Sequence, residues 1–536
     1  MAKRLTPFSK LLLTIAIVAA IVFGGKWLLD NTSAGRDLQN QAENVDNSSN
    51  ESTTTNNGNS SSNNSNNNAS NSSNSDDIIK IGVVTWGGYA GGQYFNEGFK
   101  ANKNSRFYKD YGFQVEFKVL DDFVPSREAW KRGDVDLLWA TIDAFPTEAG
   151  ALSQYQPEVV FQADWSRGGD AIVVQRGINS VSDLRGKKIA VAELTPSHSF
   201  LLWLLEAGGL KPSDVKLSFF GSAIDAADAF KNQQVEAAVV WSPDDAACLE
   251  AVAGSRVLQS TKSASHIIAD VFFAKKEFID NNRKQLQQLY EGWMKGAAEI
   301  NSNEANKRKA AKILAANFEG VDEDWAVDAI NNVRLCTHGD NENFFGINRD
   351  YNGVTGEKLY GRMNTVYSGL GVIEGAAPSW RLISNSSLVK SARGLNGPEQ
   401  ASEEAKSFTK ISDKEAKTKT AVATKRVSIN FRSGEYQLDP NAQNIIDKEF
   451  VDIAKAFGNS RIRIEGNTDN VGNHDSNVAL SKRRAEAVKT YLVNEHNVAP
   501  NRIIVIGNGP DKPVASNNSA KGKSKNRRTD FELIRD

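Results

Sequence analysis

Short apolar segments alternate with helix-like sequence from residue 78 to about residue 380. The first runs from Ile78 to Val84 and the second from Phe113 to Leu120. Three more have the same character, and each is followed by a turn and amphipathic sequence: 171–174, 188–191 and 237–240. This order is typical of α/β proteins, in which helices cover both faces of a parallel sheet. We therefore expect the strands here to be parallel and buried on both faces.

A second region with strand and helix patterns occupies residues 425–536. We expect four strands in it, at 427–431, 462–465, 503–507 and 529–534. Two helices are expected between them, at 440–457 and 476–495. This pattern predicts a compact α/β sandwich. Between the two regions, residues 384–424 are rich in Lys, Glu, Ala and Ser, and we expect a partly helical linker there.

The N-terminus has a different character. An apolar run begins at Leu11 and, counted to Leu29, has about the twenty residues that span a bilayer. Positive charge precedes the run, which keeps the N-terminus in the cytoplasm and places the rest of the chain outside. We predict a membrane anchor within residues 1–30. A cleaved signal peptide is the alternative, because the small residues at 32–34 resemble a cleavage site.

Residues 31–76 consist almost entirely of Asn, Ser and Thr, with no apolar periodicity. Such a segment cannot bury enough apolar surface to offset the entropy of ordering it. We therefore expect a disordered tether. As a random coil of about 45 residues it would span roughly 35 to 40 Å root mean square.

Composition excludes several classes of function. The 64 basic and 65 acidic side chains nearly cancel, so no overall field attracts nucleic acid. The two cysteines, Cys248 and Cys336, have neither disulfide nor zinc spacing, and we expect both to fill the core. The first region has no Cys–His pair, no Ser–His–Asp arrangement and no phosphate loop. We predict no catalytic residue, no metal and no cofactor, and hence no enzyme.

Polar and aromatic side chains follow four predicted strands of the first region, where ligands of parallel sheets gather. They are Trp86, Tyr89, Thr141, Asp143, Ser197, His198, Trp241 and Asp244. Ser197 and His198 would begin a helix, whose amides suit an anion, while the aspartates and rings suit a cation. The mixture favours a zwitterion or an amine. Three of these residues have a structural alternative. Ser197 could be a helix cap, Trp241 a core residue and His198 a hydrogen-bonded surface residue.

The predicted helix 476–495 has an arginine on its apolar face. Helical spacing places Arg484 on one ridge with Leu480, Val488 and Leu492. Because arginine keeps its proton, an inward guanidinium must find an anion or several acceptors. Asp469, in the turn after the strand, could supply the charge. Either the two residues form an internal ion pair, or they await a ligand.

Several stretches of the first region occur in a distinctive order: "IKIGVVTWGG", "GDVDLLWATIDAF", "AIVVQRGINSVSDLRGKKIAV", "LKPSDVKLSFF" and "NQQVEAAVVWSPD". In this order they resemble the periplasmic substrate-binding proteins of ABC importers for taurine, sulfonates and nitrate. The resemblance implies a two-lobed fold over residues 77–383, with an inserted lobe at about 170–268. A small-molecule solute would bind between lobes that close on it. An ABC permease would then be a further partner.

The second region contains "INFRSGEYQLDPNAQ", "IEGNTDNVGNHDSNVALSKRRAEAVKTYL", "NRIIVIGNGPDKPVASN" and "NRRTDFELI". These stretches resemble the OmpA-like peptidoglycan-binding domain over its whole length, which here is residues 425–536. The resemblance implies that Asp469 binds the ammonium group and Arg484 the carboxylate of diaminopimelate in the stem peptide. It implies further pocket residues, namely Thr468, Gly472, Asn477, Leu480 and Arg528. We expect Arg527 and Arg483 to be solvated. Asn467 departs from the family, which usually has His, Tyr or Phe there.

Together these features predict a single-pass protein of the inner membrane, with its bulk in the periplasm of a diderm bacterium, that binds a solute and peptidoglycan. One alternative is a stator component of the MotB type, or a structural envelope anchor whose two-lobed domain is a scaffold or sensor. The absence of an ionisable group from residues 11–25 argues against proton conduction. Another alternative is a pyrimidine-synthesis enzyme of the same fold, for which the sequence offers no His–Cys pairing.

Overall fold

The computed structural model describes residues 78–373, 377–429, 431–432 and 434–535. The predicted membrane segment in 1–30 and the predicted tether at 31–76 lie outside the described residues. Within those described ranges, every helix is too short or too polar to cross a bilayer.

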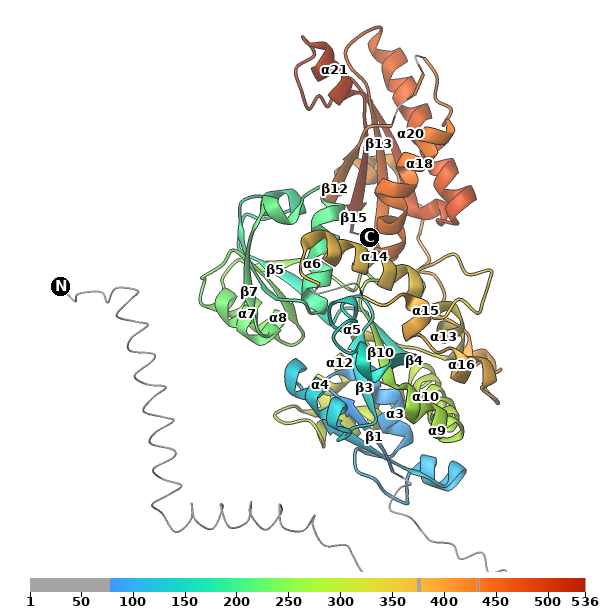
Figure 1. Ribbon diagram of the computed structural model, residues 1–536. Coiled ribbons are helices and arrows are strands. Elements are labelled where there is room, and N and C mark those ends of the chain that lie inside the picture. The colour runs from blue at the N-terminus through green and yellow to red at the C-terminus, as the bar shows by residue number, and fades with distance from the viewer. Residues whose placement is uncertain (1–77, 374–376, 430, 433, 536) are drawn as a thin grey trace, which may run out of the picture. The chain divides into compact units, whose positions relative to one another are not determined.

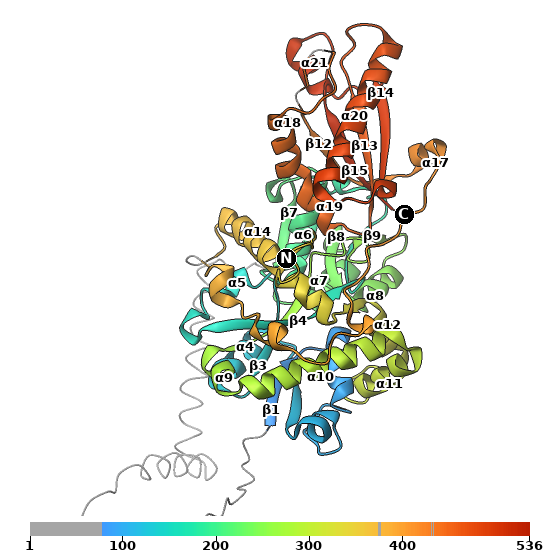
Figure 2. The same ribbon diagram turned by 90° about the vertical axis from the view of Figure 1, so that its right-hand side faces the viewer.

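The first sheet has six strands in the order β11-β4-β10-β3-β1-β2 (Figure 1). Their bounds are β1 Ile78–Val83, β2 Gln114–Val119, β3 Leu137–Thr141, β4 Pro157–Ser166, β10 Ala269–Lys275 and β11 Val333–Leu335. β1 is parallel to β2 and β3, whereas β10 is antiparallel to β3 and β4. The long helix α10 (Arg283–Ser302) packs against α3 (Ala90–Phe95) and runs across this lobe (Figure 2). It buries Trp293 among the rings of Phe161 and Phe272.

The second sheet takes all its strands from residues 170–260, in the order β7-β6-β8-β5-β9. Their bounds are β5 Asp170–Val174, β6 Lys188–Ala192, β7 Lys216–Phe220, β8 Ala237–Trp241 and β9 Arg256–Ser260. Three helices accompany it: α6 Pro196–Ala207, α7 Ala223–Lys231 and α8 Asp244–Ala251. Cys248 is free and buried in this lobe, and Cys336 is free and buried beside the first sheet, as expected.

The prediction that the strands are parallel was wrong for β5, the strand expected at 171–174. β5 is antiparallel to β8 and β9, and Asp170 at its start lies opposite Trp241 at the end of β8. The reason is the short connection: only residues 167–169 separate β4 from β5. The chain therefore passes directly from the first sheet into the second, and β5 enters this sheet at the end where β8 leaves it.

The C-terminal sheet has the order β12-β15-β13-β14. Its strands are β12 Ala421–Val427, β13 Arg461–Asn467, β14 Ile503–Gly509 and β15 Thr529–Ile534. β13 is parallel to β14 and antiparallel to β15. The strand expected at 427–431 was misplaced, because β12 ends at Val427 after pairing with β15. The helix expected at 440–457 consists of three pieces: α18 Pro440–Ile446, the π-turn η8 Asp447–Val451 and α19 Asp452–Ala456.

Helix α20 (His474–His496) lies directly on the backbones of β13 and β14. Gly466 and Gly507 are opposite each other in the register of these strands. A Cβ at Gly466 would lie 2.2 Å from the carbonyl oxygen of Ser481, and one at Gly507 would lie 2.6 Å from that of Val478. Because no side chain separates helix from sheet here, the two glycines fix the depth at which α20 packs.

Helix α14 (Gly356–Leu370) contains a glycine with open space around it. Gly361 is exposed, and nothing lies within 4 Å of the position that its Cβ would occupy. Alanine there removes backbone freedom from the unfolded chain without a clash, so Gly361→Ala should raise the free energy of unfolding by roughly 0.5–1 kcal/mol. Thermal denaturation measures this. A lower melting temperature in Gly361→Ala would contradict the open environment of this position.

Candidate functional site

A cavity of about 560 Å³ lies in the C-terminal domain, beside the end of β13 and the first turns of α20. Six of the seven residues predicted for peptidoglycan binding line it: Thr468, Asp469, Asn477, Leu480, Arg484 and Arg528. The seventh, Gly472, is not among the lining residues. It has a φ of 97° in the turn that leads into α20, a conformation that favours glycine.

Arg484 is buried in the wall of this cavity, with 8% of its surface exposed. Its Nε donates to the Glu435 carbonyl oxygen at 2.9 Å and its Nη2 to the Arg432 carbonyl oxygen at 3.2 Å. Phe431 stacks on the guanidinium, 4.8 Å from ring centroid to Cζ. Burial, together with repulsion from Arg527, lowers its pKa, but an arginine still keeps its proton. No carboxylate in the described part of the chain forms an ion pair with this cation.

Asp469 lines the same cavity and is paired with a different arginine. Nη1 of Arg527 lies 2.6 Å from its Oδ2, and the Val471 amide donates to its Oδ1 at 3.0 Å. Burial opposes ionisation, but these hydrogen bonds outweigh it and hold the pKa of Asp469 below its usual value. The internal Asp469–Arg484 pair is therefore not formed. The expectation that Arg527 is solvated was only half right, because its half-exposed side chain reaches Asp469 from the end of α21 (Ala520–Asn526).

The other polar residues of the cavity wall form a buried network. Arg528 pairs with both oxygens of Asp530, at 2.9 and 2.8 Å. Asn467 donates to Asp530 at 3.2 Å and accepts from Asn508 at 3.1 Å. Arg528 is thus already neutralised, whereas Arg484 is not. An asparagine at position 467 completes the network by hydrogen bonding, which a phenylalanine ring could not do.

A second cavity, of about 30 Å³, lies between the first and second sheets. Four of the eight residues predicted for solute binding line it: Trp86, Tyr89, Thr141 and Trp241. The others that line it were not predicted: Val84, Thr85, Trp139, Asp170, Pro196, Ile268 and Asp270.

Three aspartates converge near this second cavity. Asp270 on β10 lies opposite Thr141 of β3 and opposite Asp164 of β4, so the three form one row across the first sheet. Asp270 accepts a hydrogen bond from the Tyr89 hydroxyl at 2.9 Å, and Asp164 accepts one from Trp86 Nε1 at 3.3 Å. Asp170 faces them from the second sheet. Sequence reasoning missed all three, although each is an aspartate next to apolar residues of a strand, which is a visible signal.

The remaining four residues predicted for solute binding do not line the cavity. Ser197 and His198 are buried in the first turn of α6. Burial lowers the pKa of His198 to about 4, and its ring lies against Phe219 and Tyr367, so it is not a surface histidine. Asp143 is fully buried, which raises its pKa well above the usual value, and Asp244 begins α8.

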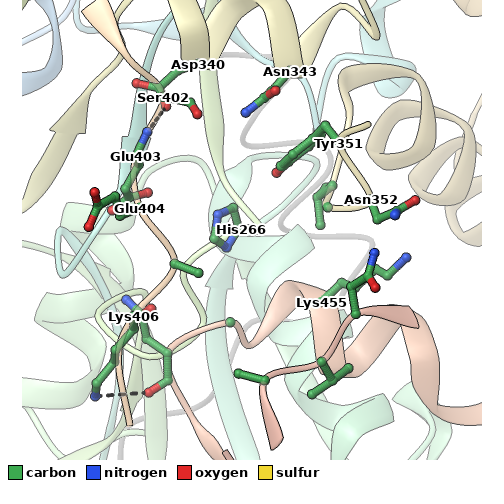
Figure 3. A pocket seen from close by; sticks show the side chains of 18 of the residues that line it. His266, Asp340, Asn343, Tyr351, Asn352, Ser402, Glu403, Glu404, Lys406 and Lys455 are labelled. Atoms are coloured by element: carbon green, nitrogen blue, oxygen red, sulfur yellow. Dashed lines mark hydrogen bonds between the residues drawn. The ribbon is translucent and has the colours of Figure 1, made fainter. Parts of the chain in front are cut away.

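A third cavity, of about 480 Å³, is lined by residues 340–354, 402–408 and parts of the C-terminal domain. His266 projects toward its middle (Figure 3), and Asp340 accepts a hydrogen bond from the Glu403 amide at 2.6 Å. Burial lowers the pKa of His266 well below its usual value, so the imidazole is neutral. Side chains of both charges are scattered around the wall rather than directed at one point, and we assign no ligand to it.

Two lobes with mixed α/β sheets, followed by a smaller α/β domain, define a periplasmic-binding-like protein with an added C-terminal domain. Comparison with protein families agrees. Residues 97–315 match the NMT1-like family and residues 430–527 match the OmpA family. The chain therefore carries an OmpA domain at its C-terminus, preceded by an NMT1-like domain, and both resemblances inferred from the sequence are confirmed.

Individual relatives match the C-terminal domain. Outer membrane protein A of Bordetella avium is 39% identical over 97 residues, which are 18% of this chain and 49% of the relative. The peptidoglycan-associated lipoprotein of Pseudomonas putida is 38% identical over 101 residues, which are 19% of this chain and 59% of the relative. The chain thus spans about half the length of these curated relatives. Among solved structures, the periplasmic aliphatic sulphonate binding protein SsuA from Escherichia coli covers 58% of this chain and 98% of its own, with 19% identity and a TM-score of 0.45.

Proposed function

We propose that this chain is a periplasmic binding protein with two binding sites, one for a solute and one for peptidoglycan. Residues 77–383 would form the receptor, 384–424 the linker and 425–536 the wall-binding domain. The predicted anchor in 1–30 and tether at 31–76 would hold the protein at the inner membrane. The observation that carries the proposal is the charge arrangement of the C-terminal cavity: a buried Arg484 without a carboxylate partner in the described structure, and an ionised Asp469.

The ligand of the C-terminal cavity is diaminopimelate, as the resemblance to the OmpA-like domain implies. Its carboxylate binds Arg484, which uses two of its five N–H groups on loop carbonyls and so keeps three for a ligand. Its ammonium group binds Asp469 and takes over from the half-exposed Arg527. Thr468, Asn477 and Leu480 shape the wall around it. A molecule with only one of the two charges would bind either Arg484 or Asp469, but not both.

Sedimentation with purified cell walls tests this site. The purified protein should sediment with peptidoglycan sacculi, and free meso-diaminopimelate should release it. Lysine should release it far less at the same concentration, because lysine has two amino groups but lacks the second carboxylate of diaminopimelate. A protein that stays in the supernatant, or whose sedimentation is indifferent to diaminopimelate, would refute the proposed wall binding.

A second candidate for the two-lobed domain is a scaffold or sensor. The small volume between the lobes, about 30 Å³, favours it, because this space holds only about two water molecules. Native mass spectrometry of the purified protein separates the candidates. A retained small molecule, or one taken up from a panel of solutes, supports the receptor and makes an ABC permease its expected partner. A protein that stays empty with every solute supports the scaffold.

A further inference from the structure

We propose that the cleft between the two lobes binds a small organic cation, an amine or quaternary ammonium compound, rather than an anion such as a sulfonate or nitrate. This inference rests on the proposed solute-binding function and specifies its ligand. It is carried by the convergence of buried carboxylates and aromatic rings on one cavity.

The side chains beside the cavity that can carry a full charge are acidic. Asp170 and Asp270 line it, and no Lys, Arg or His is among its lining residues in the described chain. Asp164 lies next to Asp270 in the same row and is fully buried. An anion placed here would therefore find no cation to pair with, and these carboxyl groups would repel it wherever they are ionised.

The nearest basic residues are already neutralised. Arg127 forms a bidentate pair with Glu148, at 2.7 and 2.8 Å, and lies over the ring of Trp139. Arg167, in the connection after β4, pairs with Glu403. Neither lines the cavity. The carboxylates of the cleft therefore have no basic side chain of their own within the described residues.

An unpartnered polar group points to a ligand independently of the charges. Thr141 lines the cavity with only 5% of its surface exposed, and its hydroxyl has no hydrogen-bond partner among the described residues. A buried hydroxyl without a partner is destabilising, because it has lost its hydrogen bonds to water and gained none. Because Thr141 is directly opposite Asp270, an ammonium group bound to Asp270 can also donate to this hydroxyl.

Aromatic rings form the rest of the wall. Trp86, Tyr89, Trp139 and Trp241 all line the cavity. The hydrogen bonds from Trp86 to Asp164 and from Tyr89 to Asp270 fix two of these rings before any ligand arrives. Ring faces attract cations, most strongly where water is excluded. The indole N–H groups of Trp139 and Trp241, which have no partner in the described structure, suit an acceptor atom elsewhere on the ligand, such as a hydroxyl oxygen.

The ligand is small, and its binding depends on pH. Burial raises the pKa of Asp164 to about 8 and that of Asp170 to about 7, and it raises the pKa of Asp270 as well. The charged or titratable groups that act on these carboxyl groups, besides one another, are Asp143, Tyr89 and Arg167, and Arg127 acts on Tyr89. These carboxyl groups thus hold protons near pH 7 when no cation is bound, and a bound cation favours the release of those protons. For each proton released, the affinity for a cation should rise by at most about tenfold per pH unit, so the affinity at pH 8.5 should exceed that at pH 6.

Isothermal titration calorimetry of the purified full-length protein tests the inference, with ethanolamine and choline as cationic probes and methanesulfonate and nitrate as anionic ones. We expect at least one cation to bind at pH 8 and neither anion to bind. Asp270→Asn should weaken cation binding at least tenfold, and Asp170→Asn should do the same. Two separate variants are measured because a loss of binding in one alone could result from misfolding. The control Asp110→Asn changes an exposed aspartate of the same lobe and should leave binding unchanged.

The outcomes separate the inference from the function on which it rests. If an anionic probe binds and neither cationic probe does, the inference is overturned, but the proposed solute-binding function stands. Binding of none of the four probes overturns the inference, and an additional empty mass spectrum overturns the receptor as well. Cation binding that survives both aspartate variants, or that weakens as pH rises, also overturns it.

Discussion

Arg484→Ala should abolish sedimentation of the protein with peptidoglycan. The guanidinium is buried, oriented by two loop carbonyls and stacked on Phe431, so it meets a ligand carboxylate in a desolvated and fixed geometry. Removing one partner of such a pair costs about 2–5 kcal/mol. At about 3 kcal/mol the affinity falls roughly a hundredfold, which is enough to leave the protein in the supernatant. Quantitative sedimentation over a range of sacculus concentrations measures the change.

The helix itself supplies the matched control. Arg483 is the neighbouring residue on α20, but it is exposed, with its guanidinium 5.5 Å from the ring of Tyr436. Arg483→Ala removes the same charge and should keep most of the binding. Arg484→Lys should not restore it, because a lysine cannot form the planar contacts of the guanidinium. Equal losses in the Arg483 and Arg484 variants would mean that the wall attracts the domain through general charge, not through this cavity.

Gly466→Val should unfold the C-terminal domain at temperatures that the unmodified chain tolerates. The added side chain would start 2.2 Å from the Ser481 carbonyl oxygen, a backbone atom that can move only with the whole of α20. Overpacking of this kind costs about 3 kcal/mol or more when backbone must shift. Since α20 also carries Arg484, we expect peptidoglycan binding to be lost together with stability.

Thermal unfolding followed by the loss of sedimentation measures this effect. Gly466→Ala is the smaller step and should be less harmful in both measurements. Gly361→Ala, in open space on α14, should leave wall binding unchanged while it slightly stabilises the chain. If Gly466→Val retained the melting temperature of the unmodified protein, the close packing of α20 on β13 would not be the constraint we infer.

Local sequence patterns predicted the helices and strands that matter most for the C-terminal site. The ridge of Leu480, Arg484, Val488 and Leu492 lies on one helix, and Arg484, Val488 and Leu492 are buried. β15 has the bounds that its apolar pattern gave, Thr529–Ile534. These features depend on residues close in the chain, where a fixed period of 3.6 or 2 residues relates sequence to structure.

Pairing between distant segments could not be predicted in this way. Asp469 was expected near Arg484 but is paired with Arg527, because α21 brings the latter across the turn. Asp164 and Asp270 of the cleft are 106 residues apart and meet only through the register of β4 and β10, and Asp170 joins them from the second sheet. A shift of that register by one residue would turn each side chain to the other face of its sheet.

By itself, the sequence determined many of the segments that become helix or strand, that an arginine must face inward on α20, and which two families the domains resemble. The tertiary structure alone decided which charges are neutralised and which remain free for a ligand. The physical reason is that periodicity is a local property of the chain, whereas the partner of a buried charge depends on strand register and helix depth, which are set by contacts between residues far apart in sequence.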